Sequence, residues 1–147
     1  MPTWIQAGFE EYAKRMPPEA RIELVELKPE DRASKQIGKV LAQEAVRIEA
    51  ALANSCKSPT RIVLDECGVM MKTTQLADWL KEWMAIGVNP CFMIGSADGL
   101  APSIKAGADK TIALSGGTLP HGIVRVLLAE QLYRAWSITQ NHPYHRE

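Results

Sequence analysis

Three short loops carry the residues that could hold a small molecule. They begin LDECG at Leu64, IGSADGL at Ile94 and LSGGTLPHG at Leu114, and each has glycine within a few residues of an apolar run. Glycine lets a backbone approach a ligand closely. An adenosine-bearing molecule suits such loops, because its base offers edges for backbone hydrogen bonds and a face for Leu64, Leu114 and Leu119. Pro120 would fix φ at about −65° where the third loop enters a helix.

The familiar nucleotide and metal motifs do not occur in this sequence. GSADGL does not match G-x-G-x-x-G, and there is no G-x-x-x-x-G-K-[ST], H-E-x-x-H or C-x-x-C. A Cys91–His121 nucleophile pair is conceivable, but Cys91 lies within an apolar run rather than at its end. We therefore expect a ligand held by backbone groups and apolar packing, and no metal.

The C-terminal segment is cationic, although the formal net charge of the chain is +0. A neutral balance argues against binding nucleic acid by bulk charge, but it leaves room for a local patch. All three histidines and three of the arginines fall in this segment: His121, His142, His145, Arg125, Arg134 and Arg146. An ordinary solvated helix and tail would show the same pattern.

Strands alternate with helices along the chain. The patterns predict helices at 3–16, 29–54, 73–87, 100–108 and 122–139, and strands at 21–28, 60–66, 90–95 and 110–115. Thr73 or Thr74 would cap the third helix and Gly87 would end it. Three strands are continuous apolar runs, which is typical of a mostly parallel sheet with helices on both faces. Ligands bind beyond the carboxyl ends of such strands, where the three loops begin.

The length of 147 residues favours a single domain spanning 1–147. No apolar run approaches the roughly 20 residues that a membrane span needs, and the start shows no signal-peptide pattern. We expect a cytoplasmic protein with no membrane partner.

The chain resembles the SPOUT class of methyltransferases, and within it the ribosomal RNA large subunit methyltransferase H family. The resemblance covers nearly the whole chain. It is strongest in IGSADGL, in a T-x-P-H loop, in an R-V-L-x-x-E-Q-x-Y-R-A helix and in a P-Y-H ending. The family methylates N3 of a pseudouridine in the large-subunit (23S) rRNA of the assembled ribosome.

This resemblance implies a C-terminal trefoil knot, an exception to the rule that chains are unknotted. It also implies S-adenosylmethionine as methyl donor, and a homodimer in which the target base enters between the knot of one subunit and the tail of the other. Carried over by position, the donor contacts are Leu64, Gly95, Leu114, Ser115, Gly116, Gly117, Thr118 and Leu119.

Methylation at N3 requires the imide proton to leave, so a group that accepts this proton or stabilises the anion would help. The resemblance makes His121, Arg125, Tyr144 and His145 the candidates for this catalytic work. Arg134 and Arg146 are expected on RNA phosphates. Tyr144 could also stack on an unpaired base, and His121 could instead be a residue that caps its helix.

The sequence departs from the family at several positions. Relatives begin with a short apolar strand before the helix that starts here at Thr3; either the start of this sequence was chosen late or the strand is absent. Ser96 replaces a common glycine, Val69 replaces a lysine, and Gly117 replaces a side chain near the donor. Two alternatives follow: a non-catalytic ribosome-binding or assembly factor with a decayed donor site, or a small nucleotide-binding enzyme of flavodoxin-like fold, for which the tail would have no role.

Overall fold

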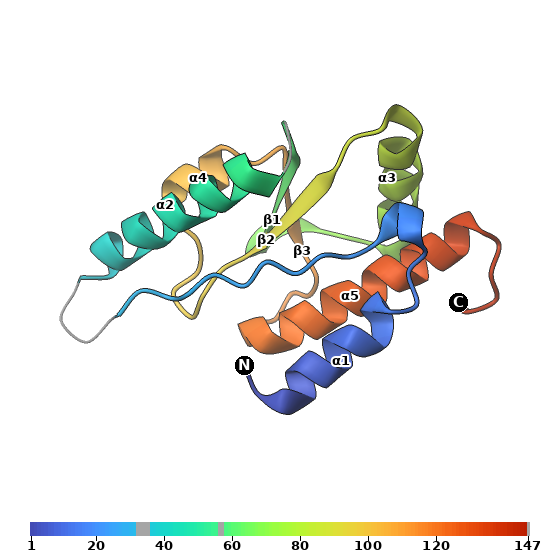
Figure 1. The fold of residues 1–147 in the computed structure, drawn as a ribbon, viewed down its shortest axis with the longest axis horizontal. Helices are drawn as coiled ribbons and strands as arrows, with labels where there is room; N and C mark the ends of the chain where they lie inside the picture. Colours follow the sequence, from blue (N-terminus) through green and yellow to red (C-terminus); the bar gives the residue numbers. More distant parts are fainter. Residues whose placement is uncertain (32–35, 56–57, 147) are drawn as a thin grey trace. The chain divides into compact units, whose positions relative to one another are not determined.

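The computed structural model describes residues 1–31, 36–55 and 58–146. Helices and strands alternate along most of the described chain, which confirms the α/β class (Figure 1). The elements are α1 (Thr3–Ala13), the short 3-10 helix η1 (Pro18–Ala20), α2 (Ile37–Ser55), β1 (Thr60–Met70), α3 (Thr73–Ile86), β2 (Pro90–Ile94), α4 (Pro102–Ala106), β3 (Lys110–Ala113) and α5 (His121–Thr139).

The chain forms two compact units, each assembled from segments that are separated in sequence. The helical unit contains Met1–Glu23, Met70–Gly87 and Leu114–Glu147. The sheet unit contains Leu24–Val69 and Val88–Ala113. That the chain is one domain therefore stays a prediction.

The sheet unit is built on three strands in the order β2-β1-β3. β1 and β2 are parallel, and Thr60 pairs with Pro90 at their start. Asp109, directly before β3, donates its N–H to the Arg61 carbonyl at 2.8 Å and accepts the Arg61 N–H at 2.7 Å. β3 therefore begins beside the start of β1, and the sheet is parallel as the sequence predicts.

Both faces of the central strand are buried. Ile62 and Val63 are consecutive in β1 and each is 0% exposed, and consecutive residues of a strand point to opposite faces. The Val63 face packs in a cluster with residues from α2, β2 and α4, and the members of this cluster are Ala45, Leu52, Val63, Met93, Leu100, Ala101 and Ile104. The continuous apolar pattern of β1 thus reflects burial on two sides.

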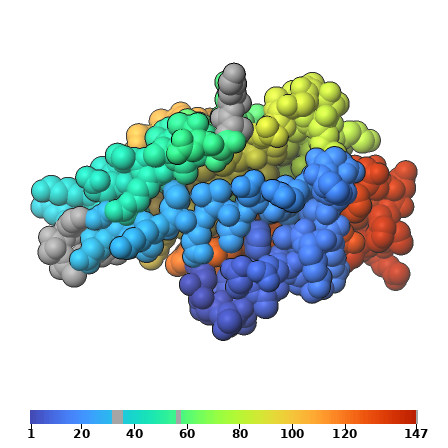
Figure 2. All heavy atoms as spheres, in the orientation of Figure 1, coloured from blue at the N-terminus to red at the C-terminus, as the bar shows by residue number. Residues whose placement is uncertain are grey.

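The predicted strand at 21–28 is wrong. Residues 21–31 form no strand, and α2 begins at Ile37 rather than at 29. The backbone of this segment bonds side chains of α2 instead of a neighbouring strand: the Lys28 carbonyl accepts from Arg47 at 2.9 Å, and the Glu30 N–H donates to Glu44 at 3.2 Å. Figure 2 shows the segment (light blue) running along α2 (teal).

Gly68 marks a close backbone approach within the sheet unit. A Cβ at this position would lie 2.8 Å from the carbonyl carbon of Ile112 in β3, a distance that side chains do not tolerate. Just before Gly68, the Cys67 N–H donates a hydrogen bond to the Asp65 carboxylate at 3.1 Å. Glycine is therefore needed here so that the end of β1 can lie against β3.

In the helical unit, α1 and α3 both pack on α5. A Cβ on Gly8 of α1 would lie 3.2 Å from Val126 of α5, so the two helices come close. Gly87 ends α3 with φ at 74°, as predicted. Neither predicted threonine caps the start of α3, however: its N-cap residue is Lys72, whose N–H donates to Gln75 at 3.0 Å.

Candidate functional site

Two of the predicted donor-binding residues lie close together, one within β1 and one directly after β2. Leu64 is the register partner of Ile94, and Gly95 follows Ile94 directly. Leu64 is the last β1 residue paired with β2, so the two residues lie at the same level of the sheet, although β1 itself continues to Met70. The expected loop at Leu64 is wrong, because the strand predicted at 60–66 continues as β1 to Met70. The role of Leu64 and Gly95 in binding stays a prediction.

Gly95 is required by the shape of its own loop. A Cβ on Gly95 would lie 2.6 Å from the carbonyl carbon of Gly99. The loop closes as a tight turn in which the Gly99 N–H donates to the Ser96 carbonyl at 2.9 Å, and Gly99 has φ at 82°. The glycine thus has a packing reason besides any approach to a ligand.

Ser96 ties this loop to α2. Its hydroxyl donates to Glu44 Oε1 at 2.9 Å, and Glu44 Oε2 accepts the Glu30 N–H. One carboxylate therefore joins the loop after β2 to the segment that precedes α2. The Ser96 hydroxyl makes a contact that a glycine at this position could not make.

Asp65, next to Leu64, is held by two partners. Its Oδ1 accepts the Cys67 N–H at 3.1 Å, and its Oδ2 lies 3.0 Å from Lys105 Nζ of α4. The backbone donor first and the lysine second lower the pKa of Asp65 below its ordinary value. The carboxylate stays charged and fixes the backbone that follows Leu64.

The loop at 114–119 precedes α5 and is open in the middle. Gly116 and Gly117 are exposed. A Cβ on Gly116 would meet only Met70 Cε, at 3.7 Å, and one on Gly117 only Ser115 Oγ, at 3.6 Å. Neither glycine has a positive φ. Unlike Gly95, both glycines could therefore be replaced without a clash or backbone strain. What the two glycines provide is an exposed backbone that no side chain covers.

The remaining members of the loop shape its two ends. Ser115 accepts the Gly117 N–H on its hydroxyl at 3.0 Å, which curls the chain locally. Leu114 and Leu119 are half-buried, and Thr118 is exposed. Pro120 is the N-cap residue of α5 with φ at −60°, as the sequence predicts.

His121 is exposed and is the first residue of α5. No side chain caps this end of the helix by a hydrogen bond, so the alternative that His121 serves as the cap is not supported. Arg125, one turn along, is half-buried. The two residues share a helix face because they are four positions apart.

The tail leaves α5 through a defined turn. Asn141 has φ at 56°, the left-handed conformation in which Asn is tolerated better than most residues. Its N–H donates to the Ile138 carbonyl at 3.2 Å, and the His142 N–H donates to the Ser137 carbonyl at 2.8 Å. This pair of bonds is the Schellman arrangement that often ends helices. It sets the direction in which the tail departs.

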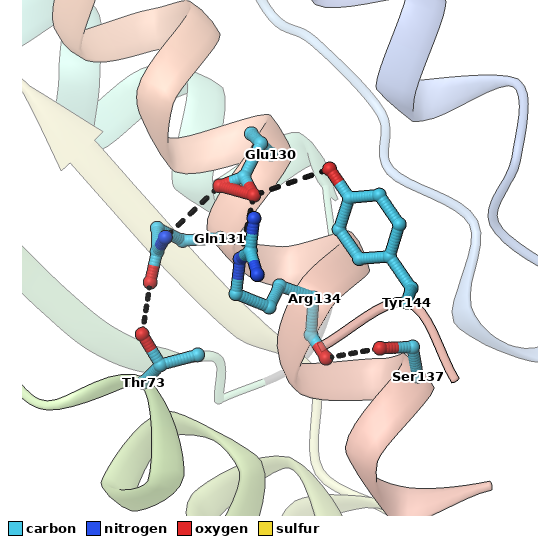
Figure 3. A network of polar contacts seen from close by, with 6 residues as sticks. All are labelled: Thr73, Glu130, Gln131, Arg134, Ser137 and Tyr144. Atoms are coloured by element: carbon cyan, nitrogen blue, oxygen red, sulfur yellow. Dashed lines mark hydrogen bonds and ion pairs between the residues drawn. The ribbon is translucent and has the colours of Figure 1, made fainter. Parts of the chain in front are cut away.

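The tail then folds back on its own helix, as Figure 3 shows. Tyr144 Oη donates to Glu130 Oε1 at 3.3 Å, and Arg134 Nε donates to the same oxygen at 2.7 Å. The Arg134 guanidinium carbon lies 4.7 Å from the centre of the Tyr144 ring, a cation–π contact. The Tyr133 ring, also 4.7 Å away, meets Tyr144 edge-on.

Burial first, and the Glu130 carboxylate second, raise the pKa of Tyr144 above its ordinary value. The phenol therefore keeps its proton at neutral pH. This disfavours Tyr144 as the proton acceptor among the predicted catalytic residues and leaves it as a hydrogen-bond donor or a stacking surface.

The other two tail residues differ in exposure. Arg146 is exposed and His145 is half-buried. His145 Nδ1 is buried and has no hydrogen-bond partner within the described chain. A buried ring nitrogen without a partner is energetically costly.

Within one chain, the predicted catalytic residues form two groups. His121 and Arg125 lie on the first turns of α5, whereas Tyr144 contacts Glu130. His121 and Glu130 are about 13 Å apart along the helix axis.

Sequence reasoning missed Glu130 and Asn141. Glu130 stands in the R-V-L-x-x-E-Q-x-Y-R-A motif, but its spacing to the tail reveals no contact until the turn at Asn141 is known. Among the described residues, no three acidic, histidine or cysteine side chains gather in a way that could hold a metal ion. None of the described helices is both long and apolar enough to span a membrane.

Comparisons with known proteins place this geometry in context. Residues 1–145 match the family described as "Predicted SPOUT methyltransferase". The chain is 60% identical to "Ribosomal RNA large subunit methyltransferase H" of Ralstonia pickettii, 58% identical to that of Cupriavidus taiwanensis and 57% identical to that of Paraburkholderia xenovorans. Each match covers 99% of this chain and 92% of the relative.

Proposed function

Because this chain belongs to the SPOUT methyltransferase family, we propose that it methylates N3 of a pseudouridine in large-subunit (23S) ribosomal RNA on the assembled ribosome, using S-adenosylmethionine. The observation that carries the proposal is the 60% identity, over 99% of the chain, to a relative named for methylation of large-subunit rRNA. We infer a cytoplasmic protein, since its substrate is the ribosome.

We propose that the donor is bound by the predicted residues of three loops, namely Leu64, Gly95, Leu114, Ser115, Gly116, Gly117, Thr118 and Leu119. The open backbone at Gly116 and Gly117 fits such a ligand, because neither packing nor φ explains glycine there. S-adenosylmethionine supplies a methyl group on a sulfonium sulfur, which is an electrophile. The half-buried leucines provide apolar surface for an adenine face.

The chain's own residues would position the base and remove the N3 proton. Tyr144 is protonated and suits stacking or hydrogen-bond donation. His145 is one candidate for a proton acceptor; its Nδ1 is buried without a hydrogen-bond partner within the described chain, so its Nε2 would have to face the base. His121 is the second candidate, and Arg125 would stabilise the anion that forms at the imide.

Arg134 and Arg146 would contact RNA phosphates. Arg146 is exposed and suits this role directly. Arg134 donates to Glu130 through its Nε, and its side chain is 27% exposed. Its terminal guanidinium nitrogens would donate to a phosphate.

A homodimer would join the two groups of catalytic residues. In one chain His121 and the Tyr144–Glu130 contact are about 13 Å apart along α5, and the family resemblance implies that a complete site takes its tail from a second copy. This separation supports the dimeric arrangement that the family resemblance implies.

Calorimetry and methyl transfer test the proposal together. The protein should bind S-adenosylmethionine and should transfer labelled methyl groups to large ribosomal subunits from a strain that lacks the native enzyme. A folded protein that binds ribosomes but not the donor would be the non-catalytic factor. Donor binding and transfer that survive deletion of 143–147 would instead favour an enzyme in which the tail has no role.

A further inference from the structure

Glu130 lies where three elements of the helical unit meet. Its Oε1 accepts from Arg134 of α5 and from Tyr144 of the tail, and its Oε2 accepts from Gln131 Nε2 at 2.9 Å. Gln131 in turn accepts on its Oε1 from the Thr73 hydroxyl at 2.7 Å, at the start of α3. Figure 3 shows this line of contacts from α3 to the tail.

The Glu130 carboxylate is mostly shielded from water. Its side chain is 14% exposed, and its two oxygens together accept three side-chain hydrogen bonds. Hydrogen bonds to a charged acceptor are about twice as strong as neutral ones, and partial burial limits their screening. Among the described residues, Glu130 is also the only acidic side chain after Asp109.

Tyr144 is fixed on three sides by this arrangement. Glu130 holds its hydroxyl, Arg134 covers one face of the ring, and Tyr133 meets the ring edge-on. Arg15 of α1 lies 5.5 Å from the Tyr133 ring. Of these neighbours, only Glu130 contacts both predicted RNA-contacting side chains, Tyr144 and Arg134, through directional bonds.

We propose that Glu130 is a positioning residue, which sets the orientation of Tyr144 and Arg134 toward the RNA by accepting hydrogen bonds from both on one oxygen. This inference rests on the proposed function, because it assigns the two side chains to substrate recognition. Glu130 itself touches no substrate. Its effect passes through the tail and through the guanidinium that it holds.

Three variants separate this role from a structural one. Glu130→Ala removes the acceptor, Glu130→Gln keeps an acceptor oxygen but removes the charge, and Glu49→Gln is the matched control. Glu49 makes a comparable pair with Arg61, at 2.8 Å, which joins α2 to β1 in the sheet unit. Each variant is measured in the full-length protein.

The first readout does not depend on methylation. The absorbance of the tyrosine phenols is followed against pH in each variant. Each variant is also made with Tyr144→Phe in addition, and the titration of this second protein is subtracted, so that only the titration of Tyr144 remains. The pKa of Tyr144 should fall in Glu130→Gln, because a negative charge beside the phenol is gone, and should be unchanged in Glu49→Gln. An unchanged pKa in Glu130→Gln would show that the carboxylate does not hold the hydroxyl, and would overturn the proposal.

The second readout is the kinetics of methyl transfer to large ribosomal subunits. Glu130→Ala should raise KM for the subunits about 10-fold or more, the range expected from losing charged hydrogen bonds. Its affinity for S-adenosylmethionine should stay within about 2-fold, and Glu130→Gln should recover part of the loss. A KM equal to or lower than that of the wild type would overturn the proposal; a lower value would mean that Glu130 withholds Arg134 from RNA.

If the wild-type protein transfers no methyl group at all, the proposed function fails and the positioning role toward RNA fails with it. The titration would still report whether Glu130 tethers the tail. If transfer occurs and only the variant effects are missing, the proposed function stands and this inference alone is wrong.

Discussion

Tyr144 and Glu130 are in contact although fourteen positions separate them in the sequence: the phenol donates to the carboxylate at 3.3 Å, and the tail thereby returns to the helix that it has just left. The tail of this chain is an ordered part of the helical unit. Its attachment includes a hydrogen bond that a protonated phenol donates to a carboxylate.

The attachment should weaken at alkaline pH. The pKa of Tyr144 is raised in the folded protein, so its contribution to stability is fully present below the ordinary tyrosine value of about 10. It is lost as the pH rises through the higher folded value. The difference in free energy of unfolding between wild type and Tyr144→Phe, measured in urea, should therefore shrink as the pH rises above 10. A constant difference across this range would contradict the assignment.

The turn at Asn141 should respond to backbone chemistry. Asn141→Gly should leave stability unchanged or slightly raised, because glycine adopts a positive φ at no steric cost. Asn141→Val should cost about 1–2 kcal/mol in the free energy of unfolding. Denaturation in urea measures both. Equal stabilities of the two variants would mean that this left-handed residue does not set the exit of the tail.

Two glycines from different loops should behave in opposite ways. Gly95→Ala should destabilise the protein by about 1–3 kcal/mol, because the new Cβ would meet the backbone of Gly99. Gly116→Ala should change the free energy of unfolding by less than about 0.5 kcal/mol but weaken binding of S-adenosylmethionine, since a Cβ has room there and only the ligand would meet it. Once the Gly116→Ala variant is shown to be as stable as the wild type, calorimetry measures its affinity for S-adenosylmethionine. An unchanged affinity would remove this loop from the donor site.

The pair of Asp65 and Lys105 should stabilise the protein at neutral but not at strongly acidic pH. The pKa of Asp65 is lowered, so its contribution is present above the ordinary aspartate value of about 3.9 and is lost as the pH falls through the folded value. Lys105 is 43% exposed, so screening by water keeps this contribution at about 1 kcal/mol or less. Asp65→Asn should match the wild type more closely at pH 3 than at pH 7. A gap that widens in acid would contradict the assignment.

The sequence predicts most of this fold because several elements carry one-sided or fully buried patterns. The run around Ile62 and Val63 indicates a strand buried on both faces, and the spacing of Leu128, Leu132 and Ala135 indicates a helix. The prediction fails at 21–28, where an extended segment packs on α2 through Lys28 and Glu30 without joining a sheet. An alternating apolar pattern indicates that one face of an extended segment is buried. It does not indicate whether the backbone of that segment pairs with a neighbouring strand.

The sequence indicates one of the loops of the candidate site but not the tail. Gly95 directly follows β2, where the rule for parallel sheets predicts a ligand, whereas Leu64 lies inside β1 because that strand is longer than its pattern indicates. The contact of Tyr144 with Glu130 depends on a single left-handed residue, Asn141, whose conformation no local pattern indicates. The distinction between Gly95 and Gly116 likewise needs the distances to surrounding atoms.

The most direct test of the proposed activity is to incubate the protein and S-adenosylmethionine with large ribosomal subunits from a strain that lacks the native enzyme, and to map the rRNA by mass spectrometry of nuclease fragments. We predict one added methyl group, on N3 of a pseudouridine in 23S rRNA, and none after deletion of 143–147. Unmodified rRNA from a protein that is folded and binds the donor, or a methyl group on a different base, would contradict this account.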